Sequence, residues 1–224
     1  MEILYQDARI LVCIKPAGIV SAGDEPGGMI DLLRQELADA QACVRSVHRL
    51  DAQVSGLMVF ARSQAAASIL SEQIRLHTFE KEYLAVVHGA LSPASGQMED
   101  LLWYNRSLRK ARVMDAPGKD VKRALLSYEV LGYAADADAS LVKIRLHTGR
   151  THQIRIQFSS RAHALLGDRK YGTGDEDGCP IALWSWRLSF LHPQSGERVT
   201  FSAAPPQKFP WSLFDCSKLA DFSV

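Results

Sequence analysis

The sequence predicts an α+β protein in which helices flank a mixed, largely antiparallel central sheet. Segments of strand character alternate irregularly with segments of helical periodicity, without the steady strand–helix–strand rhythm of a doubly wound parallel sheet. The chain has 224 residues, 47% hydrophobic and 23% charged, which is an ordinary globular composition and enough to bury a substantial core. We find no internal repeat and no linker, so we expect one domain that spans residues 1–224.

The first third of the chain shows the patterns of two strands and two helices. The expected strands are residues 9–15 and 56–62, and the expected helices are residues 29–43 and 63–76. The first strand is rich in β-branched and apolar residues and stops at Pro16, which indicates a turn. Both helices carry apolar residues at spacings of three and four, and Ser63 is a suitable N-cap for the second.

Strands dominate the remainder of the chain. The expected strands are residues 81–87, 125–131, 141–147, 181–191 and 198–202. The acidic, alanine-rich stretch 134–139 predicts a surface turn between two of these strands. One short helix is expected over residues 151–160, where Ile154 and Phe158 lie four positions apart and therefore share a buried face.

Composition argues against several classes of protein. No apolar run approaches the roughly 18 residues that a membrane span requires, and the N-terminus lacks the basic and apolar pattern of a secretory signal. The four cysteines form no Cys-x-x-Cys pair, which argues against a zinc site or a disulfide framework and suits a reducing compartment. Gly-rich phosphate-binding loops are absent. We therefore expect a cytoplasmic protein that binds no membrane, metal or nucleotide cofactor.

Charge is distributed unevenly, although the formal net charge is only +1. Residues 106–123 and 143–170 contain fourteen basic and three acidic residues, whereas the rest of the chain contains twelve basic and 22 acidic residues. His48 and Arg49 add a further basic pair. A solvated face would explain either window alone, but two windows in a nearly neutral chain favour a polyanionic partner. No basic segment shows an amphipathic helical stripe, which favours nucleic acid over a membrane.

One short segment gathers polar residue types that can carry chemistry. His48, Asp51 and Ser55 are the residue types of a hydrolase triad, but so short a segment is not expected to fold into triad geometry. If the segment is extended, Arg49 and Asp51 project from the same face. An aspartate beside apolar strand residues needs a cationic partner to stay ionised, and the basic stretch 147–155 offers candidates. A structural Asp–Arg pair at a turn is the alternative interpretation.

Distinctive sequence blocks are spaced along most of the chain. They are Lys15-Pro16-Ala17-Gly18, His48-Arg49-Leu50-Asp51 with Ser55-Gly56-Leu57, Lys81-Glu82-Tyr83, and Gly149-Arg150-Thr151-His152-Gln153-Ile154-Arg155 with Gly167-Asp168 and Tyr171-Gly172. In this order they resemble the signature segments of the RluA-type RNA pseudouridine synthases. The resemblance extends from residue 10 to residue 206, which is nearly the whole chain. Few residues precede the first block, so we expect a compact member without an N-terminal S4-like domain.

The resemblance implies a pseudouridine synthase fold with an RNA-binding cleft. It implies isomerisation of specific uridines in structured rRNA or tRNA to pseudouridine, without a cofactor or a metal. Asp51 would be the nucleophile that attacks the flipped uridine at the sugar C1′ or the base C6. Tyr83 would stack on the target base and accept a proton late in the reaction, and Arg155 would pair with Asp51 and keep it ionised. Arg49 would fill the gap that the flipped base leaves.

Further contacts with RNA are implied for residues around these positions. The expected substrate-binding residues are Arg49, His48, Arg150, His152 and Gln153, and the two basic windows would contact phosphates. Arg150 and His152 could instead cap the following helix. The expected partner is an RNA stem-loop, and the expected oligomeric state is a monomer.

The chain departs from the family pattern at several positions. Val54 replaces a usual Thr, Gln157 replaces a usual His, and residues 161–164 replace a usual Gly and Pro. These departures put the RNA target in doubt, because Gln157 and Arg161 could face RNA. They also keep open a second hypothesis, that the chain is a non-catalytic RNA-binding relative of the family.

Overall fold

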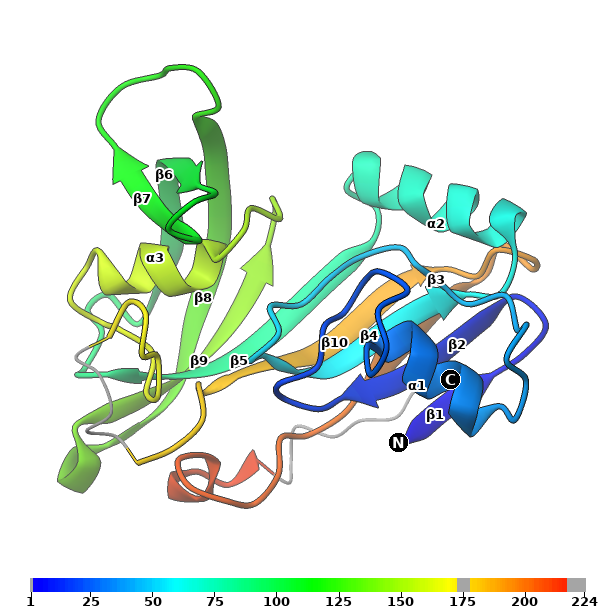
Figure 1. Cartoon of the computed structure of the whole chain (residues 1–224). Helices are drawn as coiled ribbons and strands as arrows, with labels where there is room; N and C mark the ends of the chain where they lie inside the picture. The colour runs from blue at the N-terminus through cyan, green and yellow to red at the C-terminus, as the bar shows by residue number, and fades with distance from the viewer. Residues whose placement is uncertain (1, 173–177, 217–224) are drawn as a thin grey trace. The chain divides into compact units, whose positions relative to one another are not determined.

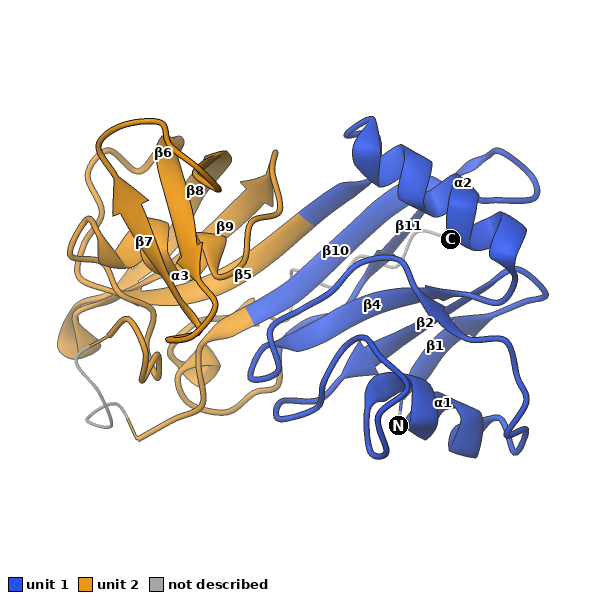
Figure 2. Ribbon diagram, turned by 45° about the horizontal axis from the view of Figure 1, so that its top comes forward, with its two compact units in different colours: residues 1–81, 184–205, 217–224 blue, residues 82–183, 206–216 orange. Residues whose placement is uncertain are grey.

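The computed structural model describes residues 2–172 and 178–216 (Figure 1). The chain divides into two compact units, shown in Figure 2. Unit 1 comprises residues 1–81, 184–205 and 217–224, and unit 2 comprises residues 82–183 and 206–216. Both units are therefore discontinuous in sequence. The single domain expected from the sequence stays a prediction.

Unit 1 is a mixed sheet with two helices. Its strands are β1 (Ile3–Gln6), β2 (Ile10–Lys15), β3 (Arg45–Ser46), β4 (Ser55–Ala61), β10 (Leu183–Leu191) and β11 (Arg198–Ser202). They run in the order β1-β2-β4-β10, with β3 on β4 and β11 on β10. The pairing of β4 with β10 is parallel and the other pairings in this unit are antiparallel. The helices are α1 (Met29–Glu36) and α2 (Gln64–Arg75).

The core of unit 1 lies between α2 and the sheet. Leu57 and Val59 of β4 pack with Leu70 of α2, and all three side chains are fully buried. The rings of Phe79 and Phe190 stack at 4.9 Å between centroids and extend this core. The helix predicted over residues 63–76 is confirmed as α2. The Ser63 side chain accepts a hydrogen bond from the Ala66 N–H and is its N-cap, as predicted.

Helix α1 is shorter than the sequence predicted. It ends at Glu36, seven residues before the expected end. Ala38 adopts a left-handed conformation with φ +50°, and the backbone N–H of Asp39 turns back to the carbonyl of Arg34. This hydrogen bond closes the helix in a Schellman-like motif. Alanine is rare at such a position, so the residue type offers little sign of the helix end.

Unit 2 is an antiparallel sheet with one short helix. Its strands run in the order β5 (Glu80–His88), β9 (Ala139–Leu146), β8 (Lys122–Ala134), β6 (Ser95–Asn105) and β7 (Lys110–Met114). Helix α3 (Gln153–Ser159) buries Ile154 and Phe158, as their spacing predicted. The expected turn between β8 and β9 contains a short 3-10 helix over Ala135–Ala137.

The sequence did not predict the hairpin of β6 and β7. Strand β7 lies at the edge of the sheet, and Ala111 is its one buried residue. An edge strand needs no continuous apolar face, so the sequence pattern that marks a buried strand is missing here. Strands and helices nevertheless mix as expected, and the α+β class with a mixed, largely antiparallel sheet is confirmed. No helix formed by residues 2–172 and 178–216 has the length and apolar character to cross a membrane.

Candidate active site

The segment that carries Asp51 is a loop of unit 1. It connects β3 to β4, and the backbone N–H of Val54 closes a turn on the Asp51 carbonyl at 3.0 Å. Asp51 is partly exposed, whereas the preceding Arg49 is exposed. Residues 49–51 form no strand, and the expectation that Arg49 and Asp51 project from one face stays a prediction.

A buried lysine supports the Asp51 loop. Lys15 is fully buried at the end of β2, and its Nζ donates hydrogen bonds of 2.8 Å to the carbonyls of Pro16, Ala52 and Val54. Two of these carbonyls belong to the turn that follows Asp51. Three acceptors match the three N–H groups of a lysine ammonium, so this group is satisfied although it is out of water. Lys15 therefore fixes the backbone of the loop, a role that the sequence pattern did not reveal.

The same ammonium group contributes charge near Asp51. Burial lowers the pKa of Lys15 to about 8, and the negative charge of Asp51 opposes that shift. Lys15 is accordingly mostly protonated at neutral pH, and its positive charge is balanced in part by the Asp51 carboxylate. The loop thus holds a carboxylate and an ammonium within electrostatic range of each other.

A serine hydroxyl provides a second support for this loop. The Ser21 Oγ donates to the Leu50 carbonyl at 2.7 Å and accepts from the Leu50 N–H at 3.1 Å. The Gly18 N–H also donates to the Ala52 carbonyl at 2.8 Å. The segment from Lys15 to Ser21 therefore holds the loop on both sides of Asp51. Sequence reasoning missed Ser21, because a hydroxyl that bonds backbone groups leaves no motif.

Gly56 sets the start of strand β4, directly after the loop. Its φ is +116°, and an added Cβ would overlap the backbone of Ser185 on β10. Glycine alone allows this conformation together with so close an approach of two strands. The glycine of the Ser55-Gly56-Leu57 block is therefore required by backbone geometry.

His48 is partly buried in unit 1 and carries no charge at neutral pH. Its Nε2 accepts a hydrogen bond from the Val59 N–H at 3.1 Å, and its ring lies 5.7 Å from that of Phe79. Burial first, and then the charge of Lys81, lower the pKa of His48 to about 3. The expectation that His48 adds positive charge beside Arg49 is therefore wrong. A contact between His48 and RNA stays a prediction.

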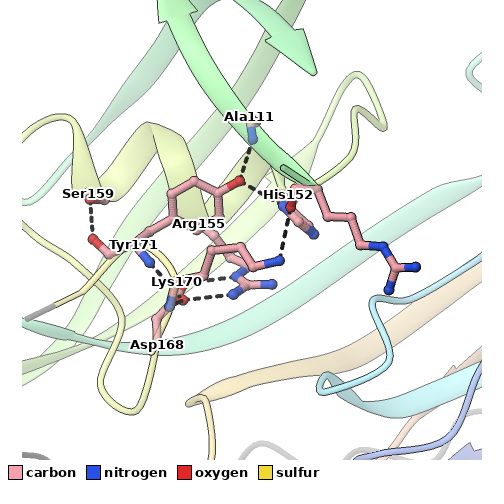
Figure 3. Close-up of polar contacts among 8 residues, drawn as sticks. Ala111, His152, Arg155, Ser159, Asp168, Lys170 and Tyr171 are labelled. Atoms are coloured by element: carbon pink, nitrogen blue, oxygen red, sulfur yellow. Dashed lines mark hydrogen bonds and ion pairs between the residues drawn. The ribbon is translucent and has the colours of Figure 1, made fainter. Parts of the chain in front are cut away.

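Unit 2 contains a buried ion pair, drawn in Figure 3. Arg155 of α3 donates from Nε to Oδ2 of Asp168 at 2.8 Å and from Nη2 to Oδ1 at 2.7 Å. Arg155 is 7% exposed and Asp168 1%. The two parallel hydrogen bonds are the bidentate geometry that guanidinium and carboxylate groups favour. The pair fixes the plane of the Arg155 guanidinium.

The backbone of the Asp168 loop strengthens this pair. Oδ1 of Asp168 also accepts from the N–H groups of Lys170, at 3.0 Å, and Tyr171, at 3.1 Å. Burial by itself would raise the pKa of Asp168, but the hydrogen bonds and charge of Arg155, together with these two N–H groups, hold that pKa below its usual value. Asp168 is ionised at neutral pH as a result.

The residues before α3 form a tight loop around Gln153. The buried Gln153 Oε1 accepts from Thr148 Oγ1 at 2.8 Å and from the Arg150 N–H at 3.0 Å. Arg150 is exposed, and its Nε donates to the Arg123 carbonyl at 2.9 Å. His152 occupies the N-cap position with φ +58° but forms no side-chain cap. Contacts of Arg150, His152 and Gln153 with substrate stay predictions.

Tyr83 lies on β5, where it is paired in register with Ile144 of β9. Its side chain is buried, and the sheet fixes its direction. The structure brings Asp51 near Lys15 in unit 1, and Arg155 near Asp168 in unit 2. The expected pairing of Asp51 with Arg155, and the expected stacking of Tyr83 on a base, stay predictions.

The departures from the family pattern have structural explanations. Gln157 is fully buried and donates from Nε2 to the Met98 carbonyl and to Asp100, so the expectation that it faces RNA is wrong. Arg161 pairs with the same Asp100 at 2.9 Å. Val54 is buried and contributes its backbone carbonyl to Lys15, so a side-chain hydroxyl is not needed to hold the turn. Among residues 2–172 and 178–216, no group of three His, Cys, Asp or Glu side chains could hold a metal ion.

Comparisons with known proteins agree with this description. Residues 9–160 match the family model described as RNA pseudouridylate synthase. The chain is 36% identical over 208 residues to the dual-specificity RNA pseudouridine synthase RluA of Escherichia coli K12, covering 91% of this chain and 92% of that protein. It is 33% identical over 225 residues to the ribosomal large subunit pseudouridine synthase D of Zymomonas mobilis, covering 92% and 70%.

A solved structure shows the same fold. Human RNA pseudouridylate synthase domain containing 1 is 26% identical, covers 96% of this chain and 86% of its own, and aligns with a TM-score of 0.77. These matches define the class of protein as an RNA-modifying isomerase. The chain belongs to the RNA pseudouridylate synthase family, as its sequence blocks predicted, and the predicted fold and reaction class are confirmed.

Proposed function

We propose that this protein converts uridine to pseudouridine in a structured rRNA or tRNA, with Asp51 as the nucleophile. The observation that carries the proposal is the loop that presents Asp51. The Lys15 ammonium and the Ser21 hydroxyl bind its backbone on both sides of Asp51, while the Asp51 side chain stays partly exposed. A carboxylate held this way is preorganised to react, because little conformational freedom is lost when substrate arrives.

The reaction needs only a group that attacks and then leaves. Asp51 attacks the flipped nucleoside at C1′ or C6, and the N1–C1′ bond breaks. The base turns, C5 bonds to C1′, and the Asp51 carboxylate is released. The proton on C5 leaves last: Tyr83, stacked on the base, takes it up and passes its own hydroxyl proton to solvent, while N1, which lost its bond to C1′, gains a proton from solvent. The product has the same atoms as the substrate, so the reaction needs no second reactant.

Arg155 is proposed to orient Asp51. A guanidinium has two edges that can each bind a carboxylate, and Asp168 occupies the edge formed by Nε and Nη2. Arg155, held in this way, pairs with Asp51 in the proposed active complex. Asp168 thereby restrains the cation that orients the Asp51 carboxylate for attack.

The RNA is proposed to lie along the exposed basic residues of unit 2. Arg106, Arg109, Lys110 and Arg112 project from the hairpin of β6 and β7 and are exposed. They contact phosphates and position the RNA without reading its sequence. Arg49 fills the space of the flipped base, whose extrusion costs a few kcal/mol. The proposed substrate is a stem-loop, which the protein binds as a monomer in the cytoplasm.

Replacement of Asp51 tests this proposal. Total RNA is incubated with the wild-type protein or with Asp51→Asn, and pseudouridine is mapped by carbodiimide modification and primer extension. We expect new pseudouridine sites with the wild-type protein, none with the variant, and RNA affinity that is the same within about threefold. Isomerisation by Asp51→Asn would contradict the assigned nucleophile. A wild-type protein that binds RNA but creates no site would instead be a non-catalytic relative.

A further inference from the structure

Tyr171 is the point at which several parts of unit 2 meet (Figure 3). Its hydroxyl accepts a hydrogen bond from the Ala111 N–H of β7 at 2.6 Å and lies 2.7 Å from Nδ1 of His152. The Arg155 guanidinium lies over the Tyr171 ring, 5.2 Å from its centroid, and Lys110 Nζ lies 5.4 Å from the same centroid. One buried side chain thus contacts both the basic hairpin and the buried ion pair.

The β6–β7 hairpin is tied at this point to the loop that carries Asp168. Strand β7 forms the edge of the sheet, next to β6. The Ala111 N–H of β7 donates to the Tyr171 hydroxyl. The carbonyl of Arg109, the residue before β7, accepts from Lys170 Nζ at 2.9 Å. Lys170 and Tyr171 are adjacent, and their own N–H groups bind Asp168. A shift of the hairpin therefore acts on the two residues that support the Arg155–Asp168 pair.

The orientation of the Tyr171 ring depends on its hydroxyl contacts. The hydrogen bonds with the strand and with the histidine fix the position of the phenol oxygen, and with it the axis of the ring. The cation–π contact with Arg155 requires that the ring face the guanidinium. If β7 moved, the hydroxyl and the axis of the ring would follow, and the position of the ring relative to the Arg155 guanidinium would change.

We propose that Tyr171 is a positioning residue, whose hydroxyl makes the orientation of Arg155 depend on where RNA holds the β6–β7 hairpin. The inference rests on the proposed function, in which Arg155 orients Asp51 and the hairpin contacts phosphates. It adds a link between the two roles: binding of RNA to the exposed hairpin sets the guanidinium for reaction. RNA that fails to engage the hairpin would then react slowly even when it is bound.

Hydrogen exchange of Arg155 tests the link without any reaction. The exchange rate of its Nε–H is measured by NMR in the wild-type protein, Tyr171→Phe, Lys170→Met and the double variant. Tyr171→Phe keeps the ring and removes the hydroxyl, and we expect about tenfold faster exchange. Lys170→Met loosens the hairpin at the Arg109 carbonyl, and we expect it to accelerate exchange in the wild-type background but to add nothing in Tyr171→Phe.

A matched control uses another tyrosine hydroxyl of unit 2. Tyr133 on β8 donates to Asp138 at 2.8 Å, and both residues are exposed. Tyr133→Phe should leave the Arg155 Nε–H exchange rate unchanged. Unchanged exchange in Tyr171→Phe, or independent effects that multiply in the double variant, would overturn the inference.

Kinetics with total tRNA separate positioning from structural support. In the wild-type background, Arg112→Gln should raise KM and lower kcat, because the hairpin contact also sets Arg155. In the Tyr171→Phe background, the same substitution should raise KM alone. An equal loss of kcat in both backgrounds would contradict the link. Coupled exchange in a protein that forms no pseudouridine would overturn the proposed function and leave the link between hairpin and Arg155 intact.

Discussion

Lys15 is a buried charged residue whose hydrogen bonds hold the loop that carries Asp51. Its three N–H groups reach three carbonyls, two of them just after Asp51. A neutral side chain at this position would remove all three hydrogen bonds, and the loss at the buried Val54 is costly in a folded protein. The backbone around Asp51 therefore depends on a residue that takes no direct part in the proposed chemistry.

Lys15→Met should destabilise the protein strongly. Methionine has a similar length but donates no hydrogen bond, so we expect the free energy of unfolding to fall by about 2–4 kcal/mol. Urea denaturation at pH 7 measures this change. Lys208→Met is the control, since Lys208 is exposed, and it should alter the free energy of unfolding by less than about 0.5 kcal/mol. A small effect at Lys15 would show that the carbonyls find other partners.

His48 predicts a specific loss of stability in acid. Its pKa is about 3 in the folded protein against an ordinary value of 6.5, so the unfolded chain binds the proton more readily at any pH between these values. Stability is therefore greatest above pH 6.5 and falls as the pH drops toward 3, by up to about 1.4 kcal/mol per pH unit. The physical cause is burial of the imidazole, which disfavours its charged form, followed by the charge of Lys81.

The measurement is urea unfolding at several pH values between 4 and 7. We expect His48→Gln to be less stable than the wild type at pH 7 but to lose less stability as the pH falls. His77→Asn serves as the control, because His77 is exposed and asparagine tolerates its φ of +58°. Equal acid sensitivity of His48→Gln and the wild-type protein would show that His48 is not the titrating group.

Among the elements, the β6–β7 hairpin concentrates exposed positive charge. Each lysine or arginine that contacts a phosphate releases counterions from RNA, so affinity decreases as salt increases. Replacing Arg106, Arg109 and Arg112 together with glutamine should weaken RNA binding. The slope of log affinity against log salt should flatten by about 0.7 for each single-strand phosphate that the variant no longer binds. Fluorescence anisotropy at several salt concentrations gives this slope.

A control variant tests whether the loss of any exposed positive charge changes the salt slope, or only the loss of charge from the hairpin. Arg75→Gln removes an exposed positive charge from α2 in unit 1, where the side chain pairs with Glu72. Its salt slope should equal that of the wild-type protein. If the triple hairpin variant also keeps the wild-type slope, the hairpin does not contact RNA.

At the scale of the whole molecule, neither unit is built from one stretch of chain. Residues 1–81 supply β1, β2 and β4, but the neighbouring strands β10 and β11 come from residues 184–205. The core of unit 1 includes Leu188, Phe190 and Phe201 from that second stretch. Residues 1–81 alone therefore lack one side of their core.

Fragments test this dependence. Residues 1–81 expressed alone should be unfolded by circular dichroism and by dispersion of amide resonances. Joining residues 1–81 to residues 184–205 through a Gly-Ser linker should recover cooperative unfolding, because it restores the partners of β4. A folded fragment 1–81 would show that β10 and β11 are dispensable for this core.

Much of this fold could be predicted from local patterns in the sequence. The apolar spacing around Leu70 and the cap at Ser63 identify α2, and runs of β-branched and apolar residues identify the buried strands. The β6–β7 hairpin escaped prediction because its edge position leaves it without a buried face. The end of α1 escaped because Ala38 takes a conformation that its residue type seldom adopts.

Some residues of the candidate site could likewise be predicted from the sequence, and others could not. Asp51 and Arg155 lie in blocks that resemble a known family, and so do two of their supports, Lys15 and Asp168, but the contacts by which those two residues act were not predicted. Lys15 and Ser21 act on backbone carbonyls, which carry no residue identity, and Asp168 pairs with Arg155 at a separation of thirteen positions in the sequence. Such contacts depend on tertiary structure, so no periodicity in the sequence can reveal them.

The division of unit 1 between two distant stretches has a consequence for biosynthesis. As the polypeptide leaves the ribosome, the strand Ile10–Lys15 emerges early, yet Phe190 and Phe201, which complete its core, are translated more than 170 residues later. During that interval its apolar surface lacks its final covering. Nascent chains of this protein should therefore be clients of cotranslational chaperones until residue 205 has emerged.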